Sequence, residues 1–316
     1  KNIFDLTKIF VGAQGTTGII AEITYRLTPI PKHTKMMVSF VKNLDAIPDL
    51  VSQLLPTKPE SLEVYDDTTF LFAKKFFKDF VKNKGFFNTI SFGLQFIPEL
   101  FMTLVTGVPK MVVLAEYAGD TESVALTMVK NAKRSLRGVR GVISRITKSK
   151  REVEKYWQIR RDSFKLLTEH SQDKSHNSRT VPFIDDIVIN PKDLPVYLPR
   201  LKNLLDSYGI FYTIAGHIGN GNLHIIPIMD FDDPKTQNTI LELTPKVYEL
   251  VREFHGSNTG EHNDGIIRTP YLRYMFSPEM MEIFREVKDM TDPDRIFNPG
   301  KKVGGTVEDI EKWMVK

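Results

Sequence analysis

The chain has 316 residues, of which 41% are apolar and 26% are charged, values that are ordinary for a folded domain exposed to water. The net charge of +4 is small and spread along the chain, so we expect no nucleic-acid partner. Because the chain has no cysteine, disulfides and thiolate zinc sites are excluded, and no apolar run reaches the roughly 18–20 residues that a membrane-spanning helix needs.

A glycine-rich loop lies near the N-terminus and leads into an alternating apolar segment. Residues 12–18 read Gly-Ala-Gln-Gly-Thr-Thr-Gly, and residues 19–27 alternate and are rich in β-branched side chains. This pattern predicts a loop followed by a strand. A P-loop or a dinucleotide-binding turn leads into a helix, so this loop is neither of the two. Residues 28–31, Thr-Pro-Ile-Pro, predict a break and a boundary.

The next part of the chain predicts one antiparallel sheet. Its elements come in the order strand, helix, strand, strand, helix, strand, which is typical of a ferredoxin-like layer. The predicted fold class is therefore α+β, with antiparallel sheet of ferredoxin-like type covered by helices. The predicted strands are residues 35–41, 61–65, 111–117 and 141–145, and the predicted helices are residues 44–55 and 123–136.

The second half of the chain alternates helices with further strands. Long amphipathic patterns predict the helices, and short β-branched runs predict the strands. The predicted helices are residues 152–167, 194–208, 238–255 and 278–290, and the predicted strands are residues 183–189, 210–215 and 223–228.

Residues 70–107 are rich in phenylalanine, with lysines interleaved at the start of the segment. Phe72, Phe76 and Phe80 fall on one helical face, and the lysines between them fall elsewhere. One interpretation is a helix that packs its apolar stripe against the sheet. The other interpretation is a basic amphipathic surface for a membrane or for a partner protein, such as an electron acceptor.

Two histidines flank a tight glycine turn in the second half of the chain. His217 and His224 enclose the sequence Ile-Gly-Asn-Gly-Asn-Leu, where one predicted strand ends and the next begins. A reversal at the glycines would bring both imidazoles to one end of a strand pair. With Glu261 they would form a set of two imidazoles and one carboxylate, which is typical of a catalytic site for zinc, manganese or iron. Each histidine taken alone is more often a structural or surface residue.

Two further side chains are candidates for work on a substrate. His262 follows Glu261 directly, and an imidazole is a type of side chain suited to proton abstraction at neutral pH. Arg160 lies on the predicted helix 152–167, and its guanidinium could hold a carboxylate by two hydrogen bonds. The alternatives are a solvated histidine and a surface arginine.

Five segments, in this order along the chain, resemble the FAD-linked oxidase family. Residues 12–20 resemble the GSEGTLGII loop that closes the flavin domain of that family, and residues 157–160 resemble its WxxR motif. Residues 216–224 are similar to its GHxGDGNxH motif and residues 260–262 to its GEH motif. Residues 292–301 are close to its DPxxIxNPGK signature. The family contains D-lactate dehydrogenases, glycolate oxidase flavin subunits and D-2-hydroxyglutarate dehydrogenases.

The resemblance implies a role for each matching residue. His217, His224 and Glu261 would bind a divalent metal that chelates the hydroxyl and carboxylate of a 2-hydroxy acid. Arg160 would hold the carboxylate, and His262 would take the hydroxyl proton as a hydride leaves C2 for the flavin. The residues that would lie along FAD are Gln14, Gly15, Thr16, Gly18, Ile20 and Asn298.

Some positions depart from the family pattern. Gln14 stands where the family usually has glutamate, Asn220 where it has aspartate, and Asn263 where glycine is common. Near Phe183 and Ile184 there is no lysine like the one that some 2-hydroxyglutarate enzymes of the family use. This difference favours a substrate of the D-lactate or glycolate type.

The resemblance also implies a division of the chain. Residues 1–33 would be the end of an FAD-binding domain and would hold its last strands. Residues 34–270 would be the substrate or cap domain, and residues 271–316 a helical tail that returns to the FAD domain. The family has about half of its FAD domain before the glycine loop, so the rest would come from the same protein or from a partner chain. We expect a cytoplasmic location, with peripheral attachment to a membrane as the alternative.

The sequence therefore predicts the substrate- and metal-binding half of an FAD-dependent 2-hydroxy acid dehydrogenase or oxidase. Two alternatives stay open. One is a docking domain for a partner or a membrane, with a vestigial site. The other is a flavin-free metalloenzyme of the type with two histidines and one carboxylate.

Overall fold

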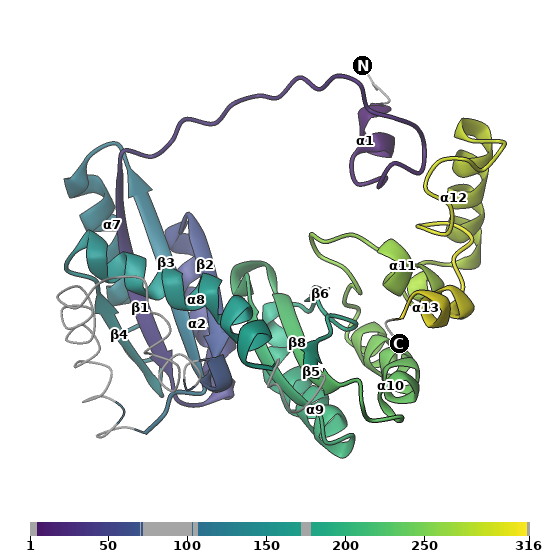
Figure 1. The fold of residues 1–316 in the computed structure, drawn as a ribbon. Coiled ribbons are helices and arrows are strands. Elements are labelled where there is room, and N and C mark those ends of the chain that lie inside the picture. Colours follow the sequence, from purple (N-terminus) through teal and green to yellow (C-terminus); the bar gives the residue numbers. More distant parts are fainter. Residues whose placement is uncertain (1–4, 70, 72–102, 104–106, 172–177, 315–316) are drawn as a thin grey trace. The chain divides into compact units, whose positions relative to one another are not determined.

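The computed structural model describes residues 5–69, 71, 103, 107–171 and 178–314 (Figure 1). The chain forms two compact units, and each is described by itself. Unit 1 combines Lys1–Pro29, Phe183–Val188 and Asp233–Lys316, whereas unit 2 combines Ile30–Pro182 and Ile189–Asp232. The chain therefore passes from one unit to the other at four places.

The first half of unit 2 is the ferredoxin-like sheet that the sequence predicts. Its strands are β1 (His33–Val41), β2 (Ser61–Asp66), β3 (Met111–Gly119) and β4 (Val142–Ile146). They pair antiparallel in the order β4-β1-β3-β2. The predicted fold class and the four predicted strands are confirmed, with small shifts at the strand ends.

Strand β2 carries this sheet on into the second half of unit 2. It pairs antiparallel with β7 (Phe211–Gly216), in a register that joins Val64 with Gly216. Strand β7 pairs in turn with β8 (Asn222–Asp230), and β8 pairs with β5 (Ser178–Thr180). One sheet therefore runs from the ferredoxin-like layer to the strands that carry the histidines.

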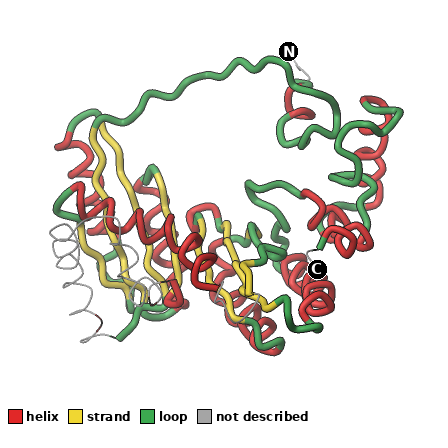
Figure 2. The backbone as a smooth tube through the Cα atoms, viewed as in Figure 1, coloured by secondary structure: helices red, strands yellow, loops and turns green. Residues whose placement is uncertain are grey.

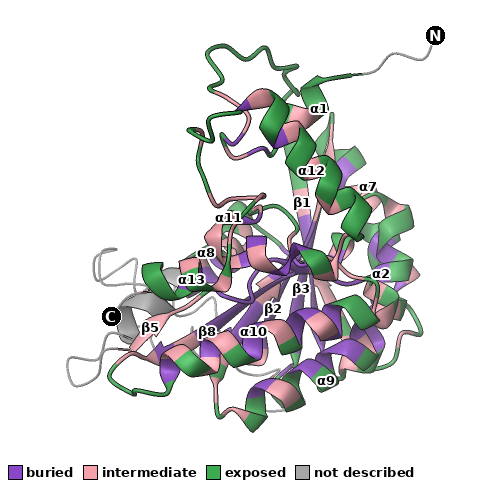
Figure 3. Cartoon of the chain, turned by 90° about the vertical axis from the view of Figure 1, so that its right-hand side faces the viewer, coloured by how far each residue is buried: buried purple, intermediate pink, exposed green. Residues whose placement is uncertain are grey.

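Both faces of this sheet are covered. Consecutive side chains of a strand point to opposite faces, and every residue of β1 from Met36 to Val41 is buried. One face packs against Tyr156 and Ile159 of α8 (Lys150–Ser171), in a cluster with Met36 and Val38. Figure 3 shows this buried layer on the strands. The helices of unit 2 are α2 (Ile47–Leu54), α7 (Glu122–Ser135), α8 (Lys150–Ser171) and α9 (Leu194–Ser207).

Unit 1 is built mainly from helices and loops. The longest of its described helices, α10 (Thr236–Glu253), buries an apolar stripe of Leu243, Val247 and Val251. The Tyr248 ring of α10 packs against the ring of Tyr271, with the ring centroids 5.4 Å apart. The elements are α1 (Thr7–Phe10), β6 (Ile187–Val188), α10 (Thr236–Glu253), α11 (Gly265–Arg268), α12 (Pro278–Thr291) and α13 (Val307–Trp313).

Two predicted strands are corrected by the structure. Residues 19–27 have no strand, and Figure 2 draws this segment as a loop. A strand needs a neighbour to accept and donate its backbone hydrogen bonds, and this segment pairs with no described strand. Residues 183–189 reduce to the short β6, because Asp186 turns the backbone with a φ of 66°. The reason for that turn lies in the candidate site.

The structure does not test the predicted domain boundaries or the predicted role of the phenylalanine-rich segment. The domain boundaries at residues 33 and 270 stay a prediction, because compact units describe packing and not functional domains. Apart from residues 71, 103 and 107, the phenylalanine-rich segment 70–107 lies outside the described residues. Both interpretations of the segment, a helix packed on the sheet and a docking surface, therefore stay predictions. Among the helices that are described, none has the length and apolar character to span a membrane.

Candidate functional site

The two candidate histidines of unit 2 stand on one hairpin. Strands β7 and β8 pair in a register that joins Ala215 with His224, and His217 follows the end of β7. The two imidazole rings meet edge to face, with centroids 5.3 Å apart and planes at 86°. The hairpin therefore brings both rings to the same end of the strand pair, as the glycine turn predicts.

Glycines make this turn possible. A β-carbon on Gly221, whose φ is 71°, would lie 1.8 Å from the carbonyl oxygen of Ile189. A β-carbon on Gly216 would lie 2.3 Å from the carbonyl oxygen of Asn222. Both distances are far inside van der Waals contact, so the close backbone approach requires glycine at both places.

A buried acid that the sequence analysis missed lies beside the first histidine. Glu63 of β2 is 6% exposed, and its Oε1 lies 2.7 Å from Nδ1 of His217. Its Oε2 lies 3.4 Å from Nη2 of Arg160 on α8. One carboxylate thus contacts a predicted metal ligand and the predicted carboxylate clamp. A glutamate in a strand whose other residues are almost all buried is the one signal that could have pointed to it.

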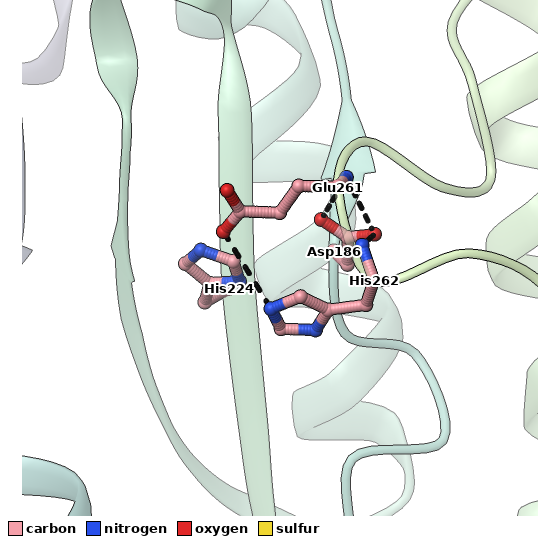
Figure 4. Close-up of side chains that lie close together, drawn as sticks. All are labelled: Asp186, His224, Glu261 and His262. Atoms are coloured by element: carbon pink, nitrogen blue, oxygen red, sulfur yellow. Dashed lines mark hydrogen bonds and ion pairs between the residues drawn. The ribbon is translucent and has the colours of Figure 1, made fainter. Parts of the chain in front are cut away.

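In unit 1, Glu261 and His262 stand on a loop that is organised by one aspartate. The Asp186 carboxylate accepts hydrogen bonds from the backbone N–H groups of Glu261 at 3.1 Å and His262 at 2.8 Å (Figure 4). It accepts another from the backbone N–H of Gly260 at 2.8 Å. It also accepts one from the Thr259 hydroxyl at 3.0 Å. Asp186 is completely buried, and this role explains the turn that shortens β6.

A second aspartate holds the ring of His262. Nδ1 of His262 lies 3.0 Å from Oδ2 of Asp185, whose side chain is 5% exposed. Nε2, on the other side of the ring, lies 3.5 Å from Oε1 of Glu261. When Nδ1 carries the proton and donates it in a hydrogen bond to Oδ2 of Asp185, the lone pair of the neutral imidazole is on Nε2, where it can accept a proton. The ring is 47% exposed and the Glu261 side chain 53% exposed, so both are accessible from solvent.

The donor atoms of this loop fit a divalent cation only in part. Asp186, Glu261 and His262 each place a ligand-type atom within 4.8 Å of the other two. Both oxygens of Asp186 already accept backbone hydrogen bonds, so Asp186 supports the loop and is a poor ligand. Glu261, whose side chain is 53% exposed and whose Oε1 lies 3.5 Å from Nε2 of His262, is the better candidate ligand.

Figure 4 also draws His224, which belongs to unit 2. The predicted meeting of His217, His224 and Glu261 joins residues of both units and stays a prediction. Each unit by itself holds donors of the right chemistry, namely a pair of imidazoles and a half-exposed carboxylate.

The glycine loop and the C-terminal tail, for which the resemblance implies contacts with FAD, lie together in unit 1. The Asn298 side chain donates to the carbonyl oxygen of Gln14 at 2.6 Å, and the Gln14 side chain accepts from the N–H of Gly265 at 3.0 Å. Thr16 is buried, and its carbonyl oxygen accepts from the buried ammonium of Lys288 at 2.6 Å. The loop is thus held in place around Gly15.

Two further predicted FAD residues lie after this cluster. Gly18 has a φ of 149°, and Ile20 is 57% exposed in a segment without regular structure. The contacts of the loop show which predicted residues are neighbours, and the flavin role of all six stays a prediction.

Comparison with known families decides the assignment of the chain. The profile described as FAD linked oxidases, C-terminal domain, matches residues 30–302. The chain belongs to this family. The resemblance that the five sequence segments suggest is therefore confirmed.

Curated relatives are similar over almost the whole chain. The glycolate oxidase subunit GlcD of Bacillus subtilis is 25% identical over 94% of this chain, which covers 57% of that protein. The D-2-hydroxyglutarate dehydrogenase of Escherichia coli is 27% identical over 94% of this chain and 28% of its own length. A probable mitochondrial D-lactate dehydrogenase of Danio rerio is 24% identical over 98% of this chain and 56% of its own length. The chain thus spans between about a quarter and three fifths of these relatives.

Solved structures agree on the fold. A 4-ethylphenol oxidase from Gulosibacter chungangensis is 16% identical, with a TM-score of 0.60 over 90% of this chain and 56% of its own. An alkyldihydroxyacetonephosphate synthase is 15% identical, with a TM-score of 0.61 over 94% of this chain and 49% of its own. At such identities the likeness concerns the fold alone, and it supports the α+β class.

Proposed function

We propose that this chain is the substrate- and metal-binding part of an FAD-dependent dehydrogenase or oxidase of a small 2-hydroxy acid. The observation that carries the proposal is the loop of unit 1, where His262 is oriented by a buried carboxylate and lies next to Glu261. A fixed imidazole beside a candidate metal ligand is suited to removing a proton from a metal-bound hydroxyl group. Membership of the FAD-linked oxidase family supports the choice of reaction.

The residues of the chain would share the work as follows. His217, His224 and Glu261 would hold a divalent cation such as zinc, manganese or iron, which lowers the pKa of the substrate hydroxyl. Arg160 would hold the substrate carboxylate. Nε2 of His262 would accept the hydroxyl proton while the C2–H bond breaks and the C–O bond becomes a carbonyl. The chemistry that bound FAD would supply is that of a hydride acceptor, so two electrons and one proton would leave C2 as a hydride and the second proton would leave the hydroxyl through His262.

The proposal includes partners that lie outside this chain. The FAD-binding half would come from the same protein or from a second chain, since the relatives are longer than this chain. Gln14, Gly15, Thr16, Gly18, Ile20 and Asn298 would contribute to the flavin side of the site. We favour a substrate of the D-lactate or glycolate type, because no lysine lies near Phe183 and Ile184 in the sequence.

The experiment uses the full-length protein that contains this chain. We expect D-lactate or glycolate, added without oxygen, to bleach the visible absorbance of the bound flavin. In the variant His262→Asn the flavin should bleach about 10²–10⁴ times more slowly, because the imidazole that would accept the hydroxyl proton is missing. The matched control is His33→Asn, on an exposed histidine at the start of β1, which should bleach at the original rate.

Three outcomes separate the alternatives. If no 2-hydroxy acid bleaches the flavin, including D-2-hydroxyglutarate, the proposed reaction is wrong. Turnover with iron and dioxygen in the absence of flavin would instead support the flavin-free metalloenzyme. Binding of a partner that is unchanged in His217→Ala and His224→Ala, without any turnover in the original protein, would support the docking domain.

A further inference from the structure

Glu63 is a buried acid in the middle of the sheet, with apolar residues before and after it in the strand. It lies in β2 between Leu62 and Val64, and the strand is buried on both faces. Burying a carboxylate is costly unless donors surround it, so a buried glutamate is kept where its contacts are useful. The pairing of Val64 with Gly216, continued by one residue, brings Glu63 opposite His217.

The two oxygens of Glu63 serve two different donors. Oε1 is 2.7 Å from Nδ1 of His217, and Oε2 is 3.4 Å from Nη2 of Arg160. The Glu63 side chain is 9% exposed, the Arg160 side chain 18% and the His217 side chain 34%. The acid is thus the inner member of the group, and the other two side chains extend from it toward solvent.

The contact with His217 decides which ring nitrogen carries the proton. A carboxylate accepts hydrogen bonds, so the short contact places the proton of a neutral imidazole on Nδ1. The lone pair is then on Nε2, the nitrogen that could bind a cation. Carboxylates that hold metal-binding histidines in this way raise the affinity of the site, and their loss typically costs about 10–100-fold in metal affinity.

We propose that Glu63 is a positioning residue that presents Nε2 of His217 to a divalent cation and at the same time fixes the guanidinium of Arg160 for the substrate carboxylate. This inference rests on the proposed function. One buried acid then couples the two binding tasks of unit 2. Substitution of Glu63 should therefore weaken the binding of metal and the binding of substrate together.

The test compares Glu63→Gln with the matched control Glu116→Gln, in the full-length protein. Glu116 lies on the neighbouring strand β3, partly buried, and contacts none of the three side chains by any described interaction. An amide has only one acceptor oxygen, so the side chain introduced by Glu63→Gln cannot accept from His217 and Arg160 in the way that the carboxylate does. Glu63→Asp is a second variant, which keeps the charge and shortens the reach by one methylene group.

Two measurements report on Glu63 without turnover. Histidine-selective ¹⁵N labelling shows by NMR which nitrogen of the His217 ring is protonated, at a pH of about 8.5, where an ordinary imidazole is neutral. Competition with a coloured chelator gives the Kd for Zn²⁺ alone. We expect a proton on Nδ1 in the original protein and in Glu116→Gln. In Glu63→Gln we expect a mixture of tautomers, a Kd for Zn²⁺ that is about 10–100-fold higher and a raised KM for the 2-hydroxy acid.

The outcomes distinguish this inference from the proposed function. If Zn²⁺ binds and both the tautomer and the Kd are the same in Glu63→Gln and Glu63→Asp as in the original protein, Glu63 has no positioning role. If the original protein binds no Zn²⁺ at all, the proposed metal site is wrong and this inference is overturned with it. A thermal unfolding curve for each variant excludes loss of the fold, because a misfolded variant would also lose its cooperative transition.

Discussion

The two parts of the candidate site are built in different ways. His217 and His224 stand on a β-hairpin, in which strand register and two glycines set the distance between the rings. Glu261 and His262 stand on a loop, in which one buried carboxylate gathers consecutive N–H groups. The first arrangement follows from local sequence, whereas the second depends on a residue that is distant in sequence. The two parts should therefore respond differently to substitution.

The largest expected effect is on the hairpin. Gly221→Ala puts a β-carbon 1.8 Å from the carbonyl oxygen of Ile189, at a φ of 71°. Backbone must move to relieve this contact, so we expect the free energy of unfolding to fall by roughly 3–5 kcal/mol. Urea unfolding measures the change.

Gly209 provides the control for this substitution. It has a similar φ of 65°, but a β-carbon there meets no atom within 4 Å. Gly209→Ala should cost only the strain of a left-handed alanine, about 1–2 kcal/mol. If the free energy of unfolding falls by the same amount in both variants, the close contact at Gly221 is not what determines the turn.

The second effect is on the loop. Asp186→Ala removes the acceptor of three backbone N–H groups and one hydroxyl. Each unpaired buried donor costs about 1–3 kcal/mol, but an exposed loop can turn some of its donors to water. We therefore expect the free energy of unfolding to fall by roughly 2–4 kcal/mol. Hydrogen exchange of the amides of residues 260–262 should become much faster, while exchange in β7 and β8 should stay the same.

Asp289→Ala is the matched control for the loop. Asp289 is 48% exposed and pairs with Arg295 at 2.6 Å on the surface of the same unit. Its loss should change the free energy of unfolding by no more than about 0.5 kcal/mol. If the amides of residues 260–262 keep their protection in Asp186→Ala, the loop does not depend on that carboxylate.

The smallest expected effect is a pH dependence within unit 2. Burial raises the pKa of Asp66 from 3.8 to about 6, against hydrogen bonds from Thr69, Ile214 and Thr213 that lower it. The folded state then binds a proton more tightly than the unfolded state. The contribution of Asp66 to stability is therefore greatest below pH about 4, and we expect it to fall by roughly 2–3 kcal/mol between pH about 4 and about 6.

Urea unfolding at several pH values measures this contribution. In Asp66→Asn the fall in the free energy of unfolding between pH about 4 and about 6 should largely disappear, whatever the absolute stability of the variant. Asp206→Asn is the control, because Asp206 forms an exposed ion pair with Lys202. In this variant the free energy of unfolding should fall with pH as it does in the original protein. A stability that rises with pH in the original protein, and no longer does so in Asp66→Asn, would mean that the hydrogen bonds outweigh burial.

Most of the regular structure could be predicted from the sequence, because it follows from local patterns. The four strands of the ferredoxin-like layer and the long helices have strong apolar periodicity. The structure has these elements at the positions that the periodicity predicts. Residues 19–27 and 183–189 have the same periodicity, but a strand also needs a partner. The first segment has no paired strand in the described part of the chain, and the second is turned by Asp186.

The supporting acids of the site could not be predicted in this way. The histidines and Glu261 stand in recognisable glycine-flanked segments, but Glu63 and Asp186 act on residues that are 154 and 76 positions away. Nothing near Glu63 in the sequence indicates a contact with His217. Such residues become visible only when the register of the sheet and the turn at Asp186 are known.

The four passages of the chain between the units have a consequence for experiments that divide the protein. The segment Phe183–Val188, which carries Asp185 and Asp186, enters unit 1 from within the sequence of unit 2. No single cleavage or truncation separates the units, because unit 1 is made of three segments of the chain and unit 2 of two, so at least one fragment always contains parts of both units. Expression of either unit as an independent fragment would need rejoined ends, and two complementary fragments would have to fold on each other to recover any function.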